Sequence, residues 1–445
     1  MITIKGRDKN VAMEQGATTF ALPRHSPLRF PTGMVPDSQL PHLPMLLDES
    51  YMRRFFARHV GNAWWGEVRH CDILNTRYKP GKRCIVTYAV TFENLSHQHI
   101  LFARLEPTCR ANPSVTVWEF PEDDQLKGLA ELMTSTHLPP TVAQPLGLHE
   151  QDVEIKVRPL SYVPGRQCTF VAFLRAGHGG GERVLGKAYN DDRGRSTYTR
   201  MKQLWHVHES GRDAFALTRP LAYDGARRVL WQTWTQGWSF QQYASNKGLE
   251  FACRRAATGL AGFHQLPVSG LPGSSAAHSL VKFRKRAEVL ARFAPSLAQP
   301  LDELWEEIRK RLPELEAQKP CPIHGDFNAS QILFDFERPV FIDLDTVCLG
   351  DPLYDVAHFI SGLHGLREKS GFSMTEIKLV SQIFVRSYQE SIPWPVNPKA
   401  LNTQIAMALI SRRAHKVLRQ LGRGAVGRIE SYIKLALDHL RQEGC

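Results

Sequence analysis

The order of hydrophobic and polar residues divides the chain into a strand-rich part and a helix-rich part. Before residue 235, short runs of β-branched and aromatic residues alternate with polar turns, a pattern typical of antiparallel strands. After that point, apolar residues recur mainly at helical spacing. Residues 1–30 show little periodicity and are expected to be loose. Helices are predicted at 46–60, 196–208, 249–266, 277–296, 298–317, 374–391, 398–421 and 425–442.

One strand-rich segment occurs twice. Residues 78–84 and residues 162–168 share the pattern Tyr-x-Pro-Gly-basic-x-Cys, and each is followed by an apolar strand, at 100–105 and at 184–189. Repetition of a whole pattern suggests internal duplication. Because Pro-Gly is a favoured turn pair, two independent occurrences are the alternative.

The second copy places Lys187 in the middle of its apolar strand, where the first copy has Arg104. Residues 181–188 nearly match a Walker A phosphate-binding loop, but such a loop must follow a strand and open a helix. Residues 183–189 have the pattern of a strand, so this interpretation is rejected. We expect the second copy to be the functional one and the first copy to be accessory, because the second copy directly precedes the helix-rich part.

The most informative segment is HGDFNASQ at residues 324–331, followed by FIDLD at residues 341–345. The intervening residues have the pattern of a hairpin, which would bring Gln331 and Asp343 to one end, with Asp326 on the loop before it. Phosphoryl transfer requires charge neutralisation on the phosphates, a nucleophile held in line and a base for its proton. An acid, an amide and further acids in this arrangement can meet those requirements.

Each of these residues receives a predicted role. Asp326 is the candidate catalytic base, because a carboxylate can orient an acceptor hydroxyl and take its proton. Gln331 and Asp343 are the candidate metal ligands, since Mg²⁺ prefers oxygen ligands. Asp345 is either a second metal ligand or a support. Three neighbouring residues are interpreted as structural: His324, Asp351 and Asp355.

Together with residues 350–357, GDPLYDVA, this segment resembles the catalytic segment of the aminoglycoside phosphotransferase and choline kinase superfamily. Gln331 and the repeated Pro-Gly turn are closest in character to maltokinase-like phosphotransferases. The resemblance implies an α+β, bilobal protein-kinase-like fold, with a small antiparallel β lobe and a larger, mainly helical lobe. The N-terminal extension would be a degenerate repeat of the small lobe. The expected divisions are a loose segment 1–30, an accessory domain 31–147, a nucleotide-binding small lobe 148–235 and a helical catalytic lobe 236–445.

The resemblance also implies where Mg²⁺ and ATP, or another nucleoside triphosphate, would bind. Lys187 would contact the phosphates, and the turn containing Gly165 would cover them through backbone amides. Backbone groups from Gln232 to Trp234 would meet the adenine, although this stretch could be an ordinary strand-to-helix connection. The predicted helix at 196–208 contains no glutamate to pair with the lysine.

The function implied is transfer of the terminal phosphoryl group to a hydroxyl of a small molecule, sugar-like or an amino alcohol. The alternative is a catalytically weak, nucleotide-binding regulator on the same fold. A protein kinase is disfavoured, because Gly325 replaces the arginine of that family's catalytic loop and no Ala-Pro-Glu follows. The sequence does not identify the acceptor, the choice between ATP and GTP, or the oligomeric state.

Composition adds limits on partners and location. The chain has 445 residues, a net charge of +12 and eight scattered cysteines without a C-x-x-C pair, which fits a cytoplasmic protein. No motif supports a nucleic-acid or membrane partner. The basic clusters at 282–292 and 412–423 lie in helical patterns and are interpreted as solvated faces. The positive charge argues against a polycationic acceptor.

Overall fold

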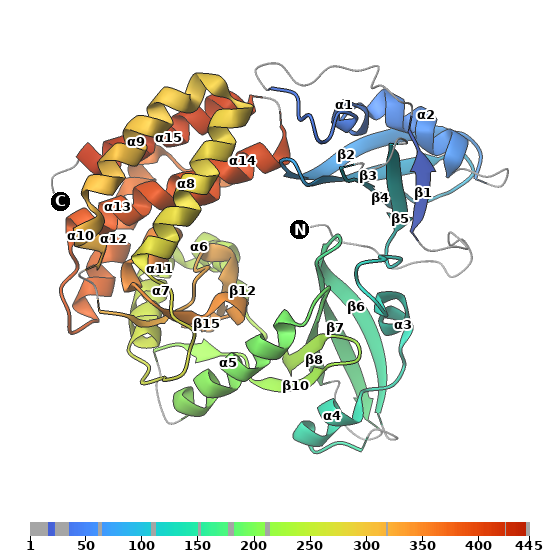
Figure 1. Cartoon of the computed structure of the whole chain (residues 1–445). Coiled ribbons are helices and arrows are strands. Elements are labelled where there is room, and N and C mark those ends of the chain that lie inside the picture. Colours follow the sequence, from blue (N-terminus) through green and yellow to red (C-terminus); the bar gives the residue numbers. More distant parts are fainter. Residues whose placement is uncertain are drawn as a thin grey trace.

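The computed structural model describes residues 17–22, 35–60, 65–107, 113–149, 153–176, 182–209, 214–316, 319–422 and 424–441. Figure 1 shows two β-sheets, one blue and one green, and a larger helical lobe in yellow to red, arranged in chain order. This is the expected α+β, bilobal protein-kinase-like fold, extended by a further sheet on the N-terminal side.

The first sheet is antiparallel, with the strand order β1-β5-β4-β3-β2. Strand β1 corrects part of the expectation that residues 1–30 are loose, because it pairs with β5, as its β-branched threonines favour. The rest of that segment, except residues 17 and 22, lies outside the described residues. The elements are β1 (Thr18–Ala21), α1 (Leu43–Leu46), α2 (Glu49–His59), β2 (Val68–Lys79), β3 (Arg83–Phe92), β4 (His99–Leu105) and β5 (Ser114–Glu119).

The second sheet is also antiparallel, with the order β10-β11-β8-β7-β6. Its strand β8 covers the residues for which the Walker A interpretation was rejected, and it is a strand as predicted. The elements are α3 (Leu129–Thr134), α4 (Pro140–Ala143), β6 (Val153–Val163), β7 (Gln167–Ala176), β8 (Arg183–Tyr189), α5 (Arg193–His208), β10 (Pro220–Asp224) and β11 (Val229–Thr233).

The two sheets repeat one pattern of strand pairing, which supports the predicted duplication. Cys84 pairs with Leu105, and Cys168 pairs with Ala188. The preceding residues on β4 and β8 therefore occupy equivalent positions: Arg104 and Lys187. The copies differ by helix α5, which lies between β8 and β10 in the second copy. The stretch 106–113 between β4 and β5 is too short for a helix of that length.

Each Pro-Gly turn is held by an aspartate from outside its hairpin. Asp123 accepts hydrogen bonds from the Tyr162 hydroxyl (2.5 Å) and from the Gly165 N–H (2.7 Å). In the first copy, Asp37 likewise accepts hydrogen bonds from the Tyr78 hydroxyl (2.7 Å) and from the Gly81 N–H (2.8 Å). We therefore propose that the second copy begins near Asp123, before the boundary predicted at residue 148.

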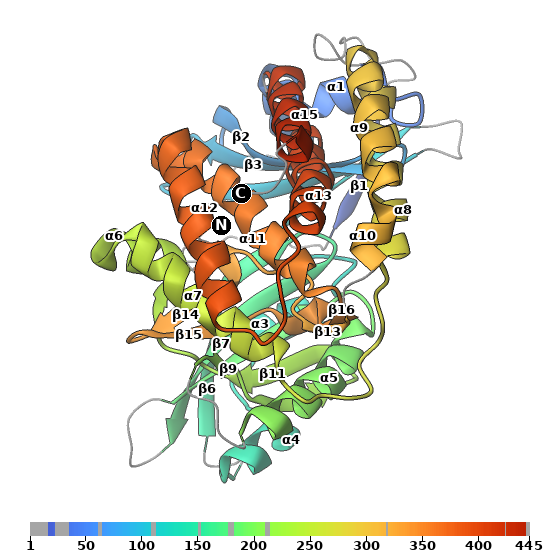
Figure 2. The ribbon, with the colours of Figure 1, turned by 90° about the vertical axis from the view of Figure 1, so that its left-hand side faces the viewer.

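The helical lobe contains the predicted helices, with two differences. The predicted helix at 298–317 is split into α9 and α10, because Pro313 lacks an N–H and its ring crowds the preceding turn. The predicted helix at 398–421 contains a π-helical segment, η6, between α13 and α14. In Figure 2, α7 lies beside α12. The elements are α6 (Phe240–Lys247), α7 (Leu249–His264), α8 (Ala276–Phe293), α9 (Ala298–Lys310), α10 (Leu312–Glu316), α11 (Pro352–Ser370), α12 (Met374–Glu390), α13 (Pro398–Ala408), η6 (Leu409–Ala414), α14 (His415–Gln420) and α15 (Ala425–Arg441).

Short strands at the base of the helical lobe position the segment that carries Asp326, Gln331 and Asp343. The predicted hairpin is formed by β14 and β15, in which Ile332 pairs with Phe341. Phe334 of this hairpin stacks on Tyr243 at 3.8 Å, so one face of the hairpin is fixed in the core. The short elements are η1 (Gln144–Leu146), β9 (Ala216–Leu217), β12 (Trp238–Ser239), η3 (Pro295–Leu297), β13 (Cys321–Ile323), η4 (Ala329–Gln331), β14 (Ile332–Asp335), β15 (Arg338–Phe341), η5 (Leu344–Thr346) and β16 (Cys348–Gly350).

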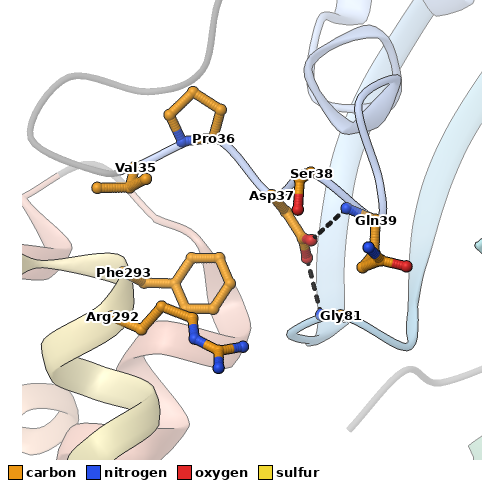
Figure 3. A pocket seen from close by; sticks show the side chains of 8 residues that line it. All are labelled: Val35, Pro36, Asp37, Ser38, Gln39, Gly81, Arg292 and Phe293. Atoms are coloured by element: carbon orange, nitrogen blue, oxygen red, sulfur yellow. Dashed lines mark hydrogen bonds between the residues drawn. The ribbon is translucent and has the colours of Figure 1, made fainter.

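The first sheet contacts the helical lobe at the end of α8. The Val35 N–H donates to the Phe293 carbonyl at 3.1 Å, and the rings of Tyr78 and Phe293 meet edge to face at 5.6 Å. Figure 3 shows a small pocket at this junction, with Arg292 and Phe293 on one side and the turn of Asp37 on the other. Because α14 also contacts β2, the first copy is attached to the helical lobe at two places.

No helix within the described ranges is both long and apolar enough to cross a bilayer.

The aspartate that holds the second turn gives a stability prediction. Asp123→Ala leaves the buried Tyr162 hydroxyl and the Gly165 N–H without an acceptor, at a cost of about 1–3 kcal/mol for each unsatisfied group. Denaturant unfolding should therefore show a large loss of stability. The matched control is Glu122→Ala, which should change the free energy of unfolding by less than about 0.5 kcal/mol. Equal effects of the two substitutions would contradict a holding role for Asp123.

Candidate active site

The loop that carries Asp326 requires a glycine before it. Gly325 has a left-handed φ of +77°, and a Cβ at this position would clash with the carbonyl oxygen of Thr346. The Thr346 hydroxyl also donates to the carbonyl of His324 at 2.9 Å. The loop that carries Asp326 therefore lies directly against the loop that carries Asp343 and Asp345.

Asp355 holds the catalytic loop from beneath. Its buried carboxylate accepts hydrogen bonds from the backbone N–H groups of His324 (2.6 Å) and Gly325 (2.9 Å), and it contacts His264 Nε2 at 3.2 Å. His324 itself donates from Nε2 to the carbonyl of Ile342 at 2.9 Å. These contacts fit the structural roles predicted for both residues.

Asp351 is also structural and caps helix α11. Its carboxylate accepts from the Leu353 N–H at 2.8 Å and from the Gln404 amide at 2.6 Å. Burial raises its pKa to about 6.

The β14–β15 hairpin brings Gln331 and Asp343 together. The Gln331 side-chain amide donates to Asp343 Oδ2 at 3.2 Å. Asp343 has a left-handed φ of +63°, a conformation that aspartate tolerates better than most residues. Because amide oxygen and nitrogen positions are assigned from hydrogen bonding, a rotation of this amide would present its oxygen beside the carboxylate.

Lys187 from the second sheet contacts both acids of this loop. Its Nζ donates to Asp343 Oδ1 at 2.5 Å and to Asp345 Oδ2 at 2.8 Å. The Tyr189 hydroxyl also donates to Asp345, at 2.8 Å, and Arg200 donates to its main-chain oxygen at 2.7 Å. The lysine therefore finds its carboxylate partners in the catalytic lobe, and helix α5 supplies none. For Asp345, these contacts favour a supporting role.

Electrostatics bind the lysine and the acids to one another. Burial would lower the pKa of Lys187, but Asp343 and Asp345 outweigh burial and raise the pKa above its usual value. Burial would raise the pKa of Asp343, but Lys187 outweighs it and lowers the pKa. The equivalent cation of the first copy, Arg104, is instead neutralised by Asp124, the residue after Asp123, with two bonds of 2.7 Å.

Asp326 contacts an arginine that the sequence reasoning did not single out. Arg412 Nη1 lies 2.7 Å from Asp326 Oδ1, and Nη2 donates to the Gly325 carbonyl at 3.0 Å. The interpretation of residues 412–423 as a solvated face is therefore wrong for Arg412. Its place in η6 gives it access to the catalytic loop. No local pattern marks a contact between residues so far apart in the chain, and the only sequence signal was the basic cluster itself.

The predicted nucleotide residues differ in how they are placed. The Gly165 N–H donates to Asp123, so this amide is already engaged. The Gln232 side chain is buried and accepts from the Thr218 hydroxyl at 2.9 Å. Trp234 follows the end of β11, where the backbone leaves the sheet.

The donor set fits a phosphate-assisted magnesium site better than a metal site made by protein alone. Within the described part of the chain, no three His, Cys, Asp or Glu side chains converge as a ready-made metal site. Mg²⁺ is usually held by one or two carboxylates, water and substrate phosphates. Gln331 and Asp343 offer an amide and a carboxylate of that kind.

Several solved structures share similarity with the chain. A choline/ethanolamine kinase family protein from Mesorhizobium loti is 13% identical over 64% of this chain and 88% of its own, with a TM-score of 0.45. A thermostable mutant of the aminoglycoside phosphotransferase APH(4)-Ia is 13% identical over 67% and 99%, with a TM-score of 0.47. The ADP-bound aminoglycoside phosphotransferase APH(2'')-Ib is 16% identical over 68% and 99%, with a TM-score of 0.45. A search of curated protein sequences found no match.

A family model also matches the chain. Residues 195–374 match the model of the phosphotransferase enzyme family, and this range contains Asp326, Gln331, Asp343 and Asp345. The match confirms the predicted resemblance: the part of this chain that holds Asp326, Gln331, Asp343 and Asp345 is similar to the phosphotransferase enzyme family.

Proposed function

We propose that this chain is a small-molecule kinase that transfers the terminal phosphoryl group of ATP, or another nucleoside triphosphate, to a hydroxyl group. The observation that carries the proposal is the contact of Lys187 with Asp343, beside Gln331 and next to the loop of Asp326. The second sheet and the helical lobe contribute to this group of residues from opposite sides. The family match supports phosphoryl transfer in general.

Asp326 would orient the acceptor hydroxyl and accept its proton. Arg412 occupies Oδ1, while Oδ2 makes no hydrogen bond with any described residue, and the side chain is 36% exposed. One carboxylate oxygen is therefore open to an acceptor. Arg412 also fixes the loop through Gly325, so it acts as a positioning residue for the base.

Lys187 would hold the phosphates of the nucleotide. In the structure its ammonium group is shared between Asp343 and Asp345. Transfer of Asp343 from the lysine to the metal would leave Lys187 oriented by Asp345, with a donor free for a phosphate oxygen. Gln331 and Asp343 would hold Mg²⁺, which supplies positive charge to the phosphates. Backbone groups near Gln232 and Trp234 would contact the base of the nucleotide.

A nucleotide-binding regulator is the second candidate, and two contacts favour it. Lys187 and Asp343 neutralise each other, and the Gly165 amide is engaged by Asp123. If these contacts persist with nucleotide present, transfer would be slow. Turnover with Mg²⁺ and a panel of hydroxyl acceptors distinguishes the candidates. Thermal stabilisation by Mg²⁺–nucleotide without turnover on any acceptor would support the regulator.

The role of Asp326 gives the first test. Asp326→Asn should reduce phosphoryl transfer by about 10²–10⁴-fold, the usual contribution of a general base, and leave the nucleotide dissociation constant nearly unchanged. ADP release with an active acceptor and calorimetric nucleotide titration measure the two effects. The control is Asp335→Asn, which alters a partly exposed acid at the turn of the β14–β15 hairpin and should retain full activity. An active Asp326→Asn enzyme would exclude the base assignment.

The two candidate metal acids can be separated by their Mg²⁺ dependence. Asp343→Asn should raise the Mg²⁺ concentration needed for half-maximal nucleotide binding by about tenfold or more, equal to a loss of at least about 1.4 kcal/mol. Asp345→Asn should change this requirement less and weaken nucleotide binding at saturating Mg²⁺, because it loosens Lys187. The same shift in both variants would assign Asp345 as a second metal ligand.

A further inference from the structure

Lys282 and Arg286 form a pair of cations on α8, called here the α8 cation pair. Four residues apart, they share one face of the helix. Lys282 Nζ lies 3.3 Å from the Tyr354 hydroxyl, and Arg286 donates to the main-chain oxygen of Ser411. Among the residues that the structure describes, neither forms an ion pair with a carboxylate. Because like charges at this spacing destabilise a helix, helix formation does not account for the pair.

Another arginine of the same helix shows the usual arrangement of a surface cation. Arg284 contacts Glu288 at 2.9 Å and Asp302 at 3.1 Å. Helix α8 therefore pairs a cation with acids on one face, whereas on another face the α8 cation pair has no ion pair with any described residue.

The α8 cation pair lies beside the candidate catalytic base. The Tyr354 hydroxyl links Lys282, at 3.3 Å, to Arg412, at 3.5 Å, and Arg412 contacts Asp326. Burial and the nearby Arg412 lower the pKa of Lys282 to about 8 and the pKa of Arg286 to about 10. Lys282 and Arg286 therefore lie close to Arg412, which itself contacts Asp326, and a bound anion would relieve the repulsion among the three cations.

We propose that the α8 cation pair binds the acceptor, and that the acceptor is a hydroxyl compound bearing a phosphate or carboxylate group. This inference rests on the proposed phosphoryl transfer at Asp326. Lysine and arginine form strong charge-assisted hydrogen bonds with such groups. An acid group held by the pair lies on the helical lobe near Asp326, whereas Lys187, the candidate phosphate ligand of the nucleotide, comes from the second sheet. A polycationic acceptor would be repelled at the same place.

The positive region continues from the α8 cation pair toward the two Pro-Gly turns. Burial, Arg166 and Arg83 lower the pKa of Arg419 in α14. Burial, Arg419 and Arg166 lower the pKa of Arg77 to about 10. The Nε atoms of Arg77 and Arg419 are buried and make no hydrogen bond within the described part of the chain. Helix α14 contacts both β2 and η6, so the first copy adds positive charge next to the element that carries Arg412, and an acceptor with a second acid group would be attracted to it.

The test compares matched acceptors: a sugar, its phosphate ester and its carboxylic acid. The wild type should use at least one of the acidic members with a kcat/KM about tenfold or more above that of the neutral sugar. Lys282→Gln and Arg286→Gln should each raise the KM of the acidic acceptor by about tenfold or more and leave the KM of the nucleotide nearly unchanged. Lys282→Arg should retain activity, which separates loss of charge from misfolding. The control is Arg284→Gln on the same helix.

The outcomes separate failure of the anionic-acceptor proposal from failure of the proposed phosphoryl transfer. Preference for the neutral sugar, with no effect of the Gln substitutions, would overturn the anionic acceptor and leave phosphoryl transfer intact. If the Gln substitutions raise the KM of the nucleotide as much as that of the acceptor, the α8 cation pair binds the donor phosphates. That result would also overturn the anionic acceptor. If no acceptor is turned over, calorimetry with the sugar phosphate and with inorganic phosphate decides. If the wild type binds these anions and Lys282→Gln does not, the anion site stands without the kinase activity. If the wild type binds neither anion, the anion site and the kinase activity are both rejected.

Discussion

The ion pairs of Lys187 with Asp343 and Asp345 are the constraint on which the site depends. A buried lysine is unfavourable unless its charge is paired, and the second sheet provides no acid for it in the described structure. The pairing holds β8 against the loop after β15. It therefore fixes the distance between the second sheet and the helical lobe at the candidate site. Breaking such a pair by removing one partner usually costs several kcal/mol, because a buried charge is left alone.

This arrangement gives the two copies of the sheet different roles. Arg104 of the first copy pairs with Asp124, in the segment that joins the two sheets, so its charge is neutralised without the loop that carries Asp343 and Asp345. In the second copy, the equivalent Lys187 reaches the catalytic lobe. The two copies therefore share the same turn and the same strand register. The first copy forms an accessory sheet, and the second copy contributes to the candidate phosphate site.

The sequence predicted the parts of the site that depend on local spacing. Gln331 and Asp343 meet because a short hairpin joins them, and the pattern of that hairpin is visible in the residues. The equivalence of Arg104 and Lys187 followed from a repeated motif. Contacts between distant elements were not predictable, because one sequence contains no information on which helix face meets which loop. Arg412 beside Asp326 and Asp123 beside Gly165 are of this kind.

The most direct test of the account is a crystal structure with Mg²⁺ and a non-hydrolysable nucleotide. The account predicts that Asp343 leaves Lys187 to bind the metal together with the Gln331 side-chain oxygen, while Lys187 contacts a phosphate and keeps its bond to Asp345. An intact contact between Lys187 and Asp343, with the phosphates bound elsewhere, would contradict it.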